Sequence, residues 1–188
     1  TAKKKDSTGV CFIGERDFDA FLDKYLLSKK GDMINVDTGK KISQHHGLYH
    51  YTLGQRKGIG IGGVGSGEPW FVVGKDLKKN LLYVAQGEQH EALYSTSLIG
   101  EAPAWTLDEE PVFPLNCTAK FRYRQQDIPV TVHKMEDGNL HIVYDNPVKA
   151  VTPGQVAVLY DADICLGSSI IKSIEPVNSK YKYLNPTF

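Results

Sequence analysis

The second half of the chain consists of short apolar segments separated by turn residues, and this regularity restricts its fold more than any other feature. Beyond about residue 95, β-branched and aromatic residues form runs at 117–123, 130–133, 140–144, 156–160 and 169–171. Turn-forming residues divide the runs at 126–127, 137–139, 146–147 and 152–154. Five or six short strands at near-even spacing predict a small closed β-barrel or a sandwich.

The first half contains one helical pattern and two hairpin patterns. Apolar residues in 17–27 recur at helical spacing, which predicts an amphipathic helix. Residues 33–42 predict a hairpin around a turn at 37–40, where Gly39 suits a positive φ. Residues 70–73 and 81–85 predict a second hairpin. We therefore expect a mainly β protein, with a small β-rich central domain at 1–94 and an antiparallel barrel at 95–188.

A proline-rich acidic segment is expected to form a long loop or to follow the boundary between the two halves. Residues 101–114 contain three prolines and four acidic residues, a composition typical of a long loop or a domain boundary.

Charge and cysteine content exclude several classes of protein. Lys and Arg number 22 and Asp and Glu also number 22, so no global field attracts nucleic acid or an anionic membrane. Residues 40–57 nevertheless carry four basic side chains, three histidines and no acid, which leaves room for a local basic patch. The three cysteines are widely spaced, without the pairs typical of disulfide frameworks or zinc sites, and a reducing cytoplasm fits best. No segment is apolar over the length of a membrane span.

Cys11 is the candidate reactive residue. It lies between Gly9 and Gly14, near Arg16 and before the predicted helix, a setting that lowers the pKa of a thiol. Cys117 and Cys165 lie within apolar strand patterns, and we expect buried, inert thiols there.

Two further clusters have competing interpretations. His45, His46 and His50 occur among tyrosines and basic residues, which suits phosphate contact and base stacking, although a solvated polar face is the simpler interpretation. A strand over 121–124 would place Arg122 and Arg124 on one face and the rings of Phe121 and Tyr123 together on the other. The two arginines would then lie within reach of phosphates, or would be ordinary edge-strand charges.

The run from Gly58 to Gly63 satisfies the G-x-G-x-x-G pattern but not its context. A dinucleotide site requires a helix after the glycines, whereas residues 64–69 contain further glycines and a proline. We reject a dinucleotide site and expect a glycine loop that allows close backbone approach, or a plain surface loop.

Three runs together carry a family resemblance. They are residues 9–15 around Cys11, residues 47–63 (GLYHYTLGQRKGIGIGG), and residues 150–155 (AVTPGQ) with 165–167 (CLG). The chain resembles tRNA-specific 2-thiouridylases of the MnmA type over nearly its whole length. It is similar to the portion downstream of their nucleotide domain, so we expect a fragment of a longer protein.

The resemblance implies ATP-dependent sulfur transfer to the wobble uridine of tRNAs for lysine, glutamate and glutamine. Cys11 matches the family's persulfide-bearing cysteine, whereas the second family cysteine, which can pair with it in a disulfide, has no counterpart here. Arg122, Tyr123 and Gln155 match tRNA-contacting residues of the family's barrel, which resembles the barrels of elongation factors. The implied partners are tRNA and a sulfur donor, either a cysteine desulfurase or a sulfur-relay protein.

ATP, with Mg²⁺, is implied for the missing nucleotide domain and not for this fragment, since the S-G-G-x-D-S loop is absent. We therefore expect the isolated chain neither to hydrolyse ATP nor to thiolate tRNA. The alternative function is a non-catalytic RNA- or protein-binding β module in which Cys11 is structural.

Overall fold

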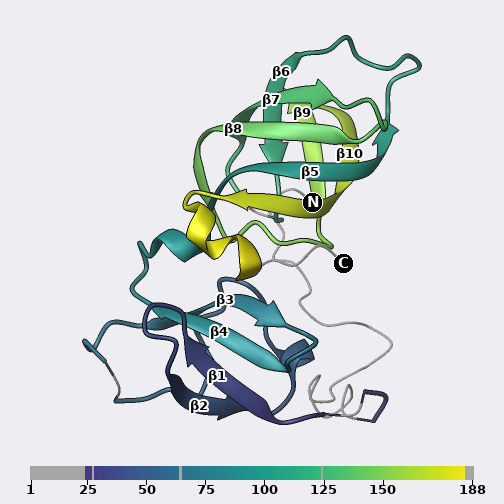
Figure 1. Ribbon diagram of the computed structural model, residues 1–188. Helices are drawn as coiled ribbons and strands as arrows, with labels where there is room; N and C mark the ends of the chain where they lie inside the picture. Colours follow the sequence, from purple (N-terminus) through teal and green to yellow (C-terminus); the bar gives the residue numbers. More distant parts are fainter. Residues whose placement is uncertain (1–23, 27, 64, 124, 185–188) are drawn as a thin grey trace, which may run out of the picture.

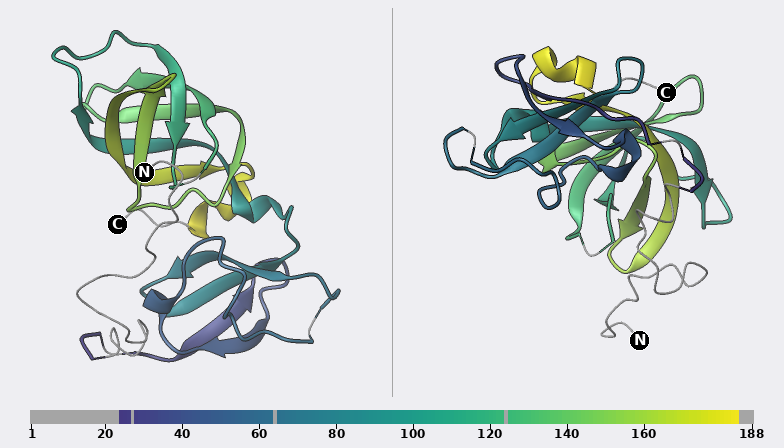
Figure 2. Two further views of the ribbon diagram at one scale, coloured as in Figure 1. Left: turned by 180° about the vertical axis from the view of Figure 1, so that it is seen from behind. Right: turned by 90° about the horizontal axis from the view of Figure 1, so that it is seen from below.

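The computed structural model describes residues 24–26, 28–63, 65–123 and 125–184, and these residues are mainly β. A small sheet lies at one end of the molecule and a barrel at the other, and the 3-10 helix η3 (Ser179–Leu184) lies between them (Figure 1). The view from behind shows the same arrangement (Figure 2, left). The predicted helix at 17–27 lies almost wholly outside the described residues.

The small sheet is built from the two predicted hairpins, both of which are confirmed. Its strands are β1 (Gly31–Asn35), β2 (Lys41–His45), β3 (Trp70–Asp76) and β4 (Leu81–Gln86), in the order β2-β1-β4-β3. Gly39 adopts the expected positive φ of 66° in the first turn. The sequence patterns did not predict the parallel pairing of β1 with β4, which joins the hairpins into one sheet.

Each face of the small sheet is covered by a different part of the chain. One face packs against the segment that follows β2 and includes the 3-10 helix η1 (Leu48–His50); its buried residues include Met33, Leu48, Tyr51 and Val72. The other face packs against the 3-10 helix η2 (Glu91–Leu93) and against η3. Because η3 follows the last barrel strand, the end of the described chain returns to the first sheet.

The barrel confirms the expected architecture of the second half. Within the described residues it comprises β5 (Tyr94–Trp105), β6 (Leu115–Lys120), β7 (Ile128–Lys134), β8 (Leu140–Lys149), β9 (Val156–Asp161) and β10 (Ile164–Pro176). Antiparallel pairs close it in the order β10-β5-β8-β7-β6-β9.

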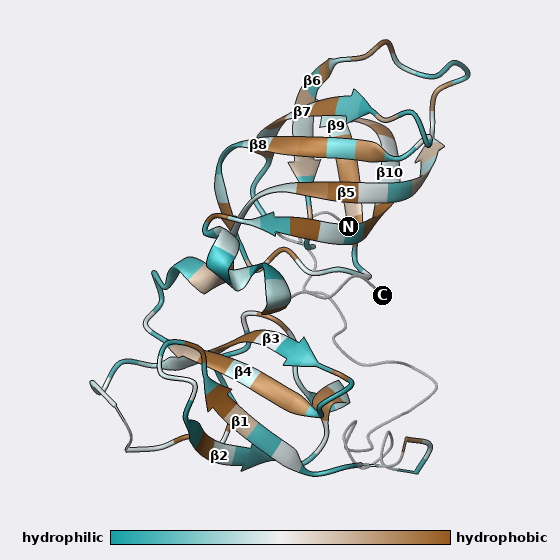
Figure 3. Cartoon of the chain, viewed as in Figure 1, coloured by the Kyte–Doolittle hydropathy of each residue, from teal (hydrophilic) through white to brown (hydrophobic). Residues whose placement is uncertain are grey.

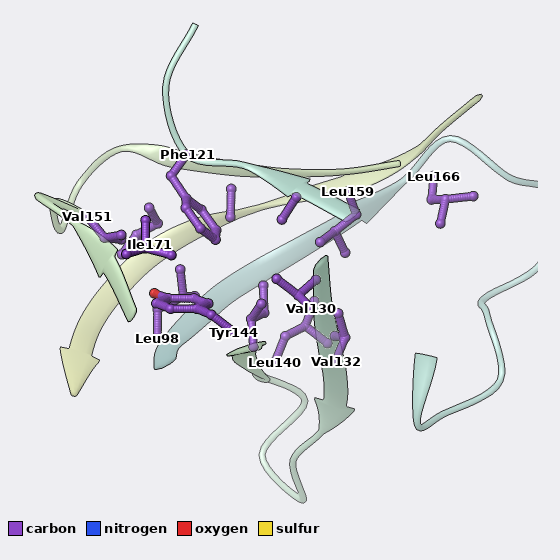
Figure 4. Close-up of a cluster of buried hydrophobic side chains, with 14 residues drawn as sticks. Leu98, Phe121, Val130, Val132, Leu140, Tyr144, Val151, Leu159, Leu166 and Ile171 are labelled. Carbon is purple, nitrogen blue, oxygen red and sulfur yellow. The ribbon is translucent and has the colours of Figure 1, made fainter. Parts of the chain in front are cut away.

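The barrel core is formed by apolar side chains that alternate along the strands. Leu140, Ile142 and Leu159 are fully buried, and burial of each such side chain stabilises the fold by roughly 1.5–3 kcal/mol. The rings of Phe121 and Tyr144 lie 5.1 Å apart near one end of this cluster (Figure 4). Hydrophobic segments alternate with hydrophilic ones along β5 and β8 (Figure 3).

Two sequence-based expectations about loops are wrong, and both involve proline. Residues 101–105 belong to β5, where the register with β10 shifts around Ala102, which has a φ of 48°. Asn146 and Pro147 belong to β8, in a segment where four residues face one residue of β5. Both strands accommodate proline because a residue in a bulge does not have to donate a backbone hydrogen bond to the neighbouring strand, and proline has no N–H to donate.

Candidate nucleic-acid interface

A groove of about 690 Å³ opens where one end of the barrel meets the loop that follows η1. The three residues matched to tRNA contacts, Arg122, Tyr123 and Gln155, all line it, although Gln155 is far from the other two in sequence. Residues that sequence reasoning did not single out complete the lining: Thr52, Lys120, Phe121, Val156, Val158 and Tyr160. The groove thus combines cationic, aromatic and amide side chains.

The segment after β6 is a tight turn rather than the predicted strand. The backbone N–H of Phe121 donates to Oε1 of Gln125 at 2.9 Å, and the N–H of Gln125 donates to the Arg122 carbonyl at 3.1 Å. Phe121 is buried in the barrel core, whereas Tyr123 is 79% exposed. The predicted common face for these two rings is therefore wrong, and Arg124 lies outside the described residues.

The Tyr123 ring is exposed to solvent at the groove. Its exposure gives a flat apolar surface beside cationic groups, which is the combination that binds single-stranded nucleic acid. Lys120 lies nearby, with its Nζ 5.3 Å from the centre of the Tyr160 ring and 3.5 Å from Asp127 Oδ1. This ion pair is partly exposed, so an incoming phosphate competes with it at little cost.

Arg122 joins the groove to the small sheet. Its Nη2 donates to the Leu53 carbonyl at 3.0 Å and to the Ala150 carbonyl at 2.8 Å, with Thr152 Oγ1 at 3.4 Å. Burial lowers the pKa of Arg122 from its ordinary value, but an arginine remains charged at neutral pH.

Gln155 is held by a turn at the start of β9. Its N–H donates to the Thr152 carbonyl at 3.2 Å, its carbonyl accepts from the N–H of Ile171 at 2.7 Å, and Gly154 supplies a φ of 85°. Its side-chain Oε1 is buried and has no hydrogen-bond partner among the described residues. An acceptor in this state is suited to an external donor, because leaving it unpaired costs free energy.

The cysteines differ in what the structure describes. Cys11 lies outside the described residues. Cys117 and Cys165 are half-buried in the barrel strands, and burial raises the pKa of Cys117 to about 11. The Cys117 thiol is therefore protonated at neutral pH, which agrees with the expectation that it is inert.

The histidine cluster is not a single solvated face. His45 is 1% exposed, and its Nε2 donates to the Asn80 carbonyl at 3.1 Å. Burial lowers its pKa, so the ring is neutral at neutral pH. His46 is exposed and its Nδ1 lies 3.1 Å from the Tyr51 hydroxyl. His45 is thus part of the interior, which corrects the solvated-face interpretation for this residue.

The glycine loop leads into a strand. The element after residues 58–69 is β3, so the strand, loop and helix that bind a nucleotide phosphate are not formed here. The loop borders a second hollow of about 500 Å³, lined by Arg56 and Trp70.

Neither metal binding nor membrane insertion is indicated by the described part of the chain. No group of three or more His, Cys, Asp or Glu side chains there is arranged to hold a metal ion. No helix in the same residues has the length and apolar character needed to span a membrane.

Two family models match the chain. Residues 19–86 match the tRNA methyl transferase PRC-barrel domain, and residues 95–171 match the Aminomethyltransferase beta-barrel domain.

Curated relatives share more than half of their aligned residues with the chain. The tRNA-specific 2-thiouridylase MnmA of Listeria monocytogenes serovar 1/2a is 53% identical over 184 residues, which is 98% of this chain and 49% of the relative. The protein of the same name from Alkaliphilus oremlandii is 55% identical over 174 residues, 93% of this chain and 48% of the relative. The tRNA-specific 2-thiouridylase MnmA 2 of Geobacillus kaustophilus is 53% identical over 184 residues, which is 98% of this chain and 49% of the relative. The chain spans about half the length of these relatives.

Proposed function

The chain belongs to the MnmA family of tRNA-specific 2-thiouridylases, and from this membership we propose that its protein transfers sulfur to a tRNA uridine while the barrel groove holds the RNA. The observation that carries the proposal is the meeting of Lys120, Arg122, Tyr123 and Gln155 in one groove. We place the division between the central domain and the barrel near residue 94.

The side chains of the groove suit a single-stranded RNA loop. A cation neutralises phosphate, and an exposed ring stacks on an unpaired base. The buried Oε1 of Gln155 accepts a hydrogen bond from an N–H of a base or from a ribose 2′-hydroxyl. The proposed RNA is the anticodon loop of tRNAs for lysine, glutamate and glutamine, and its modification would occur in the cytoplasm.

The proposed chemistry places the transferred sulfur on Cys11 as a persulfide. The outer sulfur attacks C2 of the wobble uridine and forms a carbon–sulfur bond, while the activated oxygen leaves C2. A second thiol from the rest of the protein attacks Cys11 Sγ; the sulfur–sulfur bond breaks, the product keeps the outer sulfur and the two cysteines form a disulfide. A sulfur-donor protein reloads Cys11 after the disulfide is reduced. Activation of the oxygen is assigned to residues outside this chain, since the S-G-G-x-D-S loop has no counterpart in it.

The chemistry and the binding are tested separately. In the full-length protein, Cys11→Ser is expected to abolish 2-thiouridine formation, measured by nucleoside mass spectrometry, and to leave the dissociation constant for tRNA within twofold of wild type. Cys165→Ser, in the barrel, is the matched control and should retain thiolation. If the Cys11→Ser variant thiolates tRNA normally, the sulfur-transfer proposal is wrong and the alternative function, a non-catalytic binding module, remains.

Tyr123→Ala tests the groove. Loss of one stacking contact costs about 1–3 kcal/mol, so tRNA affinity should fall by five- to a hundredfold. Tyr183→Ala, which removes an exposed tyrosine of η3 outside the groove, is the control. Equal tRNA affinities of wild type and Tyr123→Ala would contradict the proposal that the groove binds the RNA.

A further inference from the structure

The small sheet and the barrel meet at a tightly filled junction. A void of only about 10 Å³ remains among residues that include Leu53, Gly54, Leu93, Ala150 and Val151. This space is at the lower limit for a single water molecule. The relative position of the two parts is therefore fixed by direct contact.

Ala150 is the centre of this junction. Its N–H donates to the Leu93 carbonyl at 2.7 Å, its carbonyl accepts from Arg122, and its φ is 55°. A left-handed conformation is costly for alanine, so the surrounding contacts must hold it.

Gly54 leaves room for Ala150. A Cβ at position 54 would lie 2.5 Å from the Ala150 Cβ, closer than carbon atoms approach without displacement. The Gly54 N–H also donates to the Val72 carbonyl at 2.8 Å, so this loop is tied to β3. Displacement at Gly54 would consequently move the small sheet relative to the barrel.

Arg122 connects the junction to the groove. Its Nη2 makes three hydrogen bonds whose acceptors lie on both sides of the junction: Leu53 on one side, Ala150 and Thr152 on the other. Thr52, one residue before Leu53, lines the groove together with Arg122. The wall of the groove is therefore built from both parts of the molecule.

We propose that Arg122 is a positioning residue, whose guanidinium holds the loop at Thr52–Gly54 against Ala150–Thr152 and thereby sets the shape of the RNA groove. This role deepens the proposed function and rests on it. RNA affinity then depends on Arg122 through the junction, and the phosphate charge is neutralised by other cations such as Lys120.

The proposal separates affinity from salt dependence. Arg122→Lys retains the charge but lacks the planar group that reaches both carbonyls. Arg122→Lys and Arg122→Ala are both expected to weaken tRNA binding about tenfold. Both should keep the wild-type slope of log K against log salt concentration, since no phosphate contact is lost.

Gly54→Ala tests the same junction from a residue that does not itself line the groove. It should reproduce the tenfold loss, and the double variant Gly54→Ala with Ala150→Gly should recover affinity to within twofold, because the second change removes the clashing methyl group. Gly39→Ala is the control for backbone strain. Gly39, like Gly54, has a positive φ, but nothing lies within 4 Å of a Cβ there. The Gly39→Ala variant should bind tRNA with wild-type affinity.

Hydrogen exchange of the full-length protein without RNA gives a readout independent of binding. The amides of Gly54, Val72 and Ala150 should exchange faster in Arg122→Lys and in Gly54→Ala, and at the wild-type rate in Gly39→Ala. If wild type does not bind tRNA while these amides respond as expected, the proposed function fails and the positioning role stands. If Arg122→Lys binds like wild type, or Arg122→Ala lowers the salt slope by about one, Arg122 is a phosphate contact and the proposal is overturned.

Discussion

At the scale of single residues, the glutamines Gln125 and Gln155 have opposite hydrogen-bond states. Oε1 of Gln125 accepts from the Phe121 N–H, whereas the buried Oε1 of Gln155 has no partner among the described residues. A polar atom that the fold leaves unsatisfied at a groove is a common sign that stability has been exchanged for binding.

The first prediction compares these glutamines. Gln155→Met should leave the free energy of unfolding unchanged or raise it by up to about 1 kcal/mol, and should weaken tRNA binding. Gln125→Met, which orphans the Phe121 N–H, should lower the free energy of unfolding by about 1–3 kcal/mol. Urea unfolding and tRNA titration measure both effects. Destabilisation by Gln155→Met equal to that by Gln125→Met would contradict an unpaired acceptor.

The second prediction concerns His45. Because burial lowers the pKa of His45, the folded state binds a proton less readily than the unfolded state, in which the histidine has a pKa of about 6.5. The contribution of His45 to stability is therefore complete above that pH and is lost as the pH falls below it. Urea unfolding of wild type between pH 5 and pH 8 should show this decline, and His45→Gln should reduce its slope. Parallel curves for the two proteins would show that another group is responsible.

The sequence identified some residues of the site but not their arrangement. Tyr123 and Gln155 were assigned from family resemblance alone, whereas Arg122 was also predicted from the strand pattern at 121–124. The barrel topology brings the three together. The bonds from Arg122 to the Leu53 and Ala150 carbonyls leave no sequence pattern, because backbone acceptors are present at every position. Lys120 and Tyr160 had only a weak signal, as residues within two predicted strands.

At the scale of elements, β3 and η3 are in close contact. Gly74 of β3 has no room for a side chain, since a Cβ there would lie 2.7 Å from the Leu184 backbone oxygen and Cβ. Leu184 is 1% exposed. The docking of η3 therefore depends on the bare backbone of β3.

The third prediction follows from this contact. Gly74→Ala should displace η3 and lower the free energy of unfolding by about 1–3 kcal/mol, the usual cost of overpacking. Gly62→Ala is the matched control, since Gly62 has neither a positive φ nor any atom within 4 Å of a Cβ, and its effect should stay within about 0.5 kcal/mol. Thermal and urea unfolding measure both variants. Equal free energies of unfolding for Gly74→Ala and Gly62→Ala would mean that β3 and η3 can move apart enough to accept the methyl group without loss of stability.

Local sequence signals predicted the hairpins better than the pairing between them. Turn chemistry around Gly39 is a local property, and both hairpins formed as expected. The start of β5 and the parallel contact of β1 with β4 depend on residues distant in sequence. Prolines at 103 and 147 favoured loops, but bulges accommodate them within strands.

At the scale of the whole molecule, several contacts among the described residues join the small sheet to the barrel. Besides the junction at Ala150, they include the Arg122 bonds, the ion pair between Lys149 and Glu88 at 3.0 Å, and the packing of η3 against the sheet. Lys149 Nζ also lies 4.8 Å from the centre of the Phe71 ring. The apolar packing makes the larger contribution, because exposed ion pairs stabilise little.

The fourth prediction is that η3 couples the unfolding of the two parts. Termination of the protein after Val177 removes Tyr181 and Leu184 from the sheet, and each buried side chain of this size contributes roughly 1.5–3 kcal/mol. Calorimetry should show the small sheet melting at a lower temperature than the barrel in the truncated protein. Leu184→Met, a change that preserves volume, is the control and should shift the melting temperature little. A truncated protein with the wild-type profile would mean that η3 is dispensable.

The return of η3 to the first sheet also has a consequence for synthesis on the ribosome. The strands of that sheet are synthesised before the barrel, but the apolar face that η2 and η3 cover stays partly exposed until the residues up to Leu184 have left the exit tunnel. Nascent chains are thus expected to expose apolar surface while the barrel is being synthesised, and premature termination within the barrel should yield products that chaperones and proteases recognise. Completion of the small sheet therefore waits for the synthesis of η3.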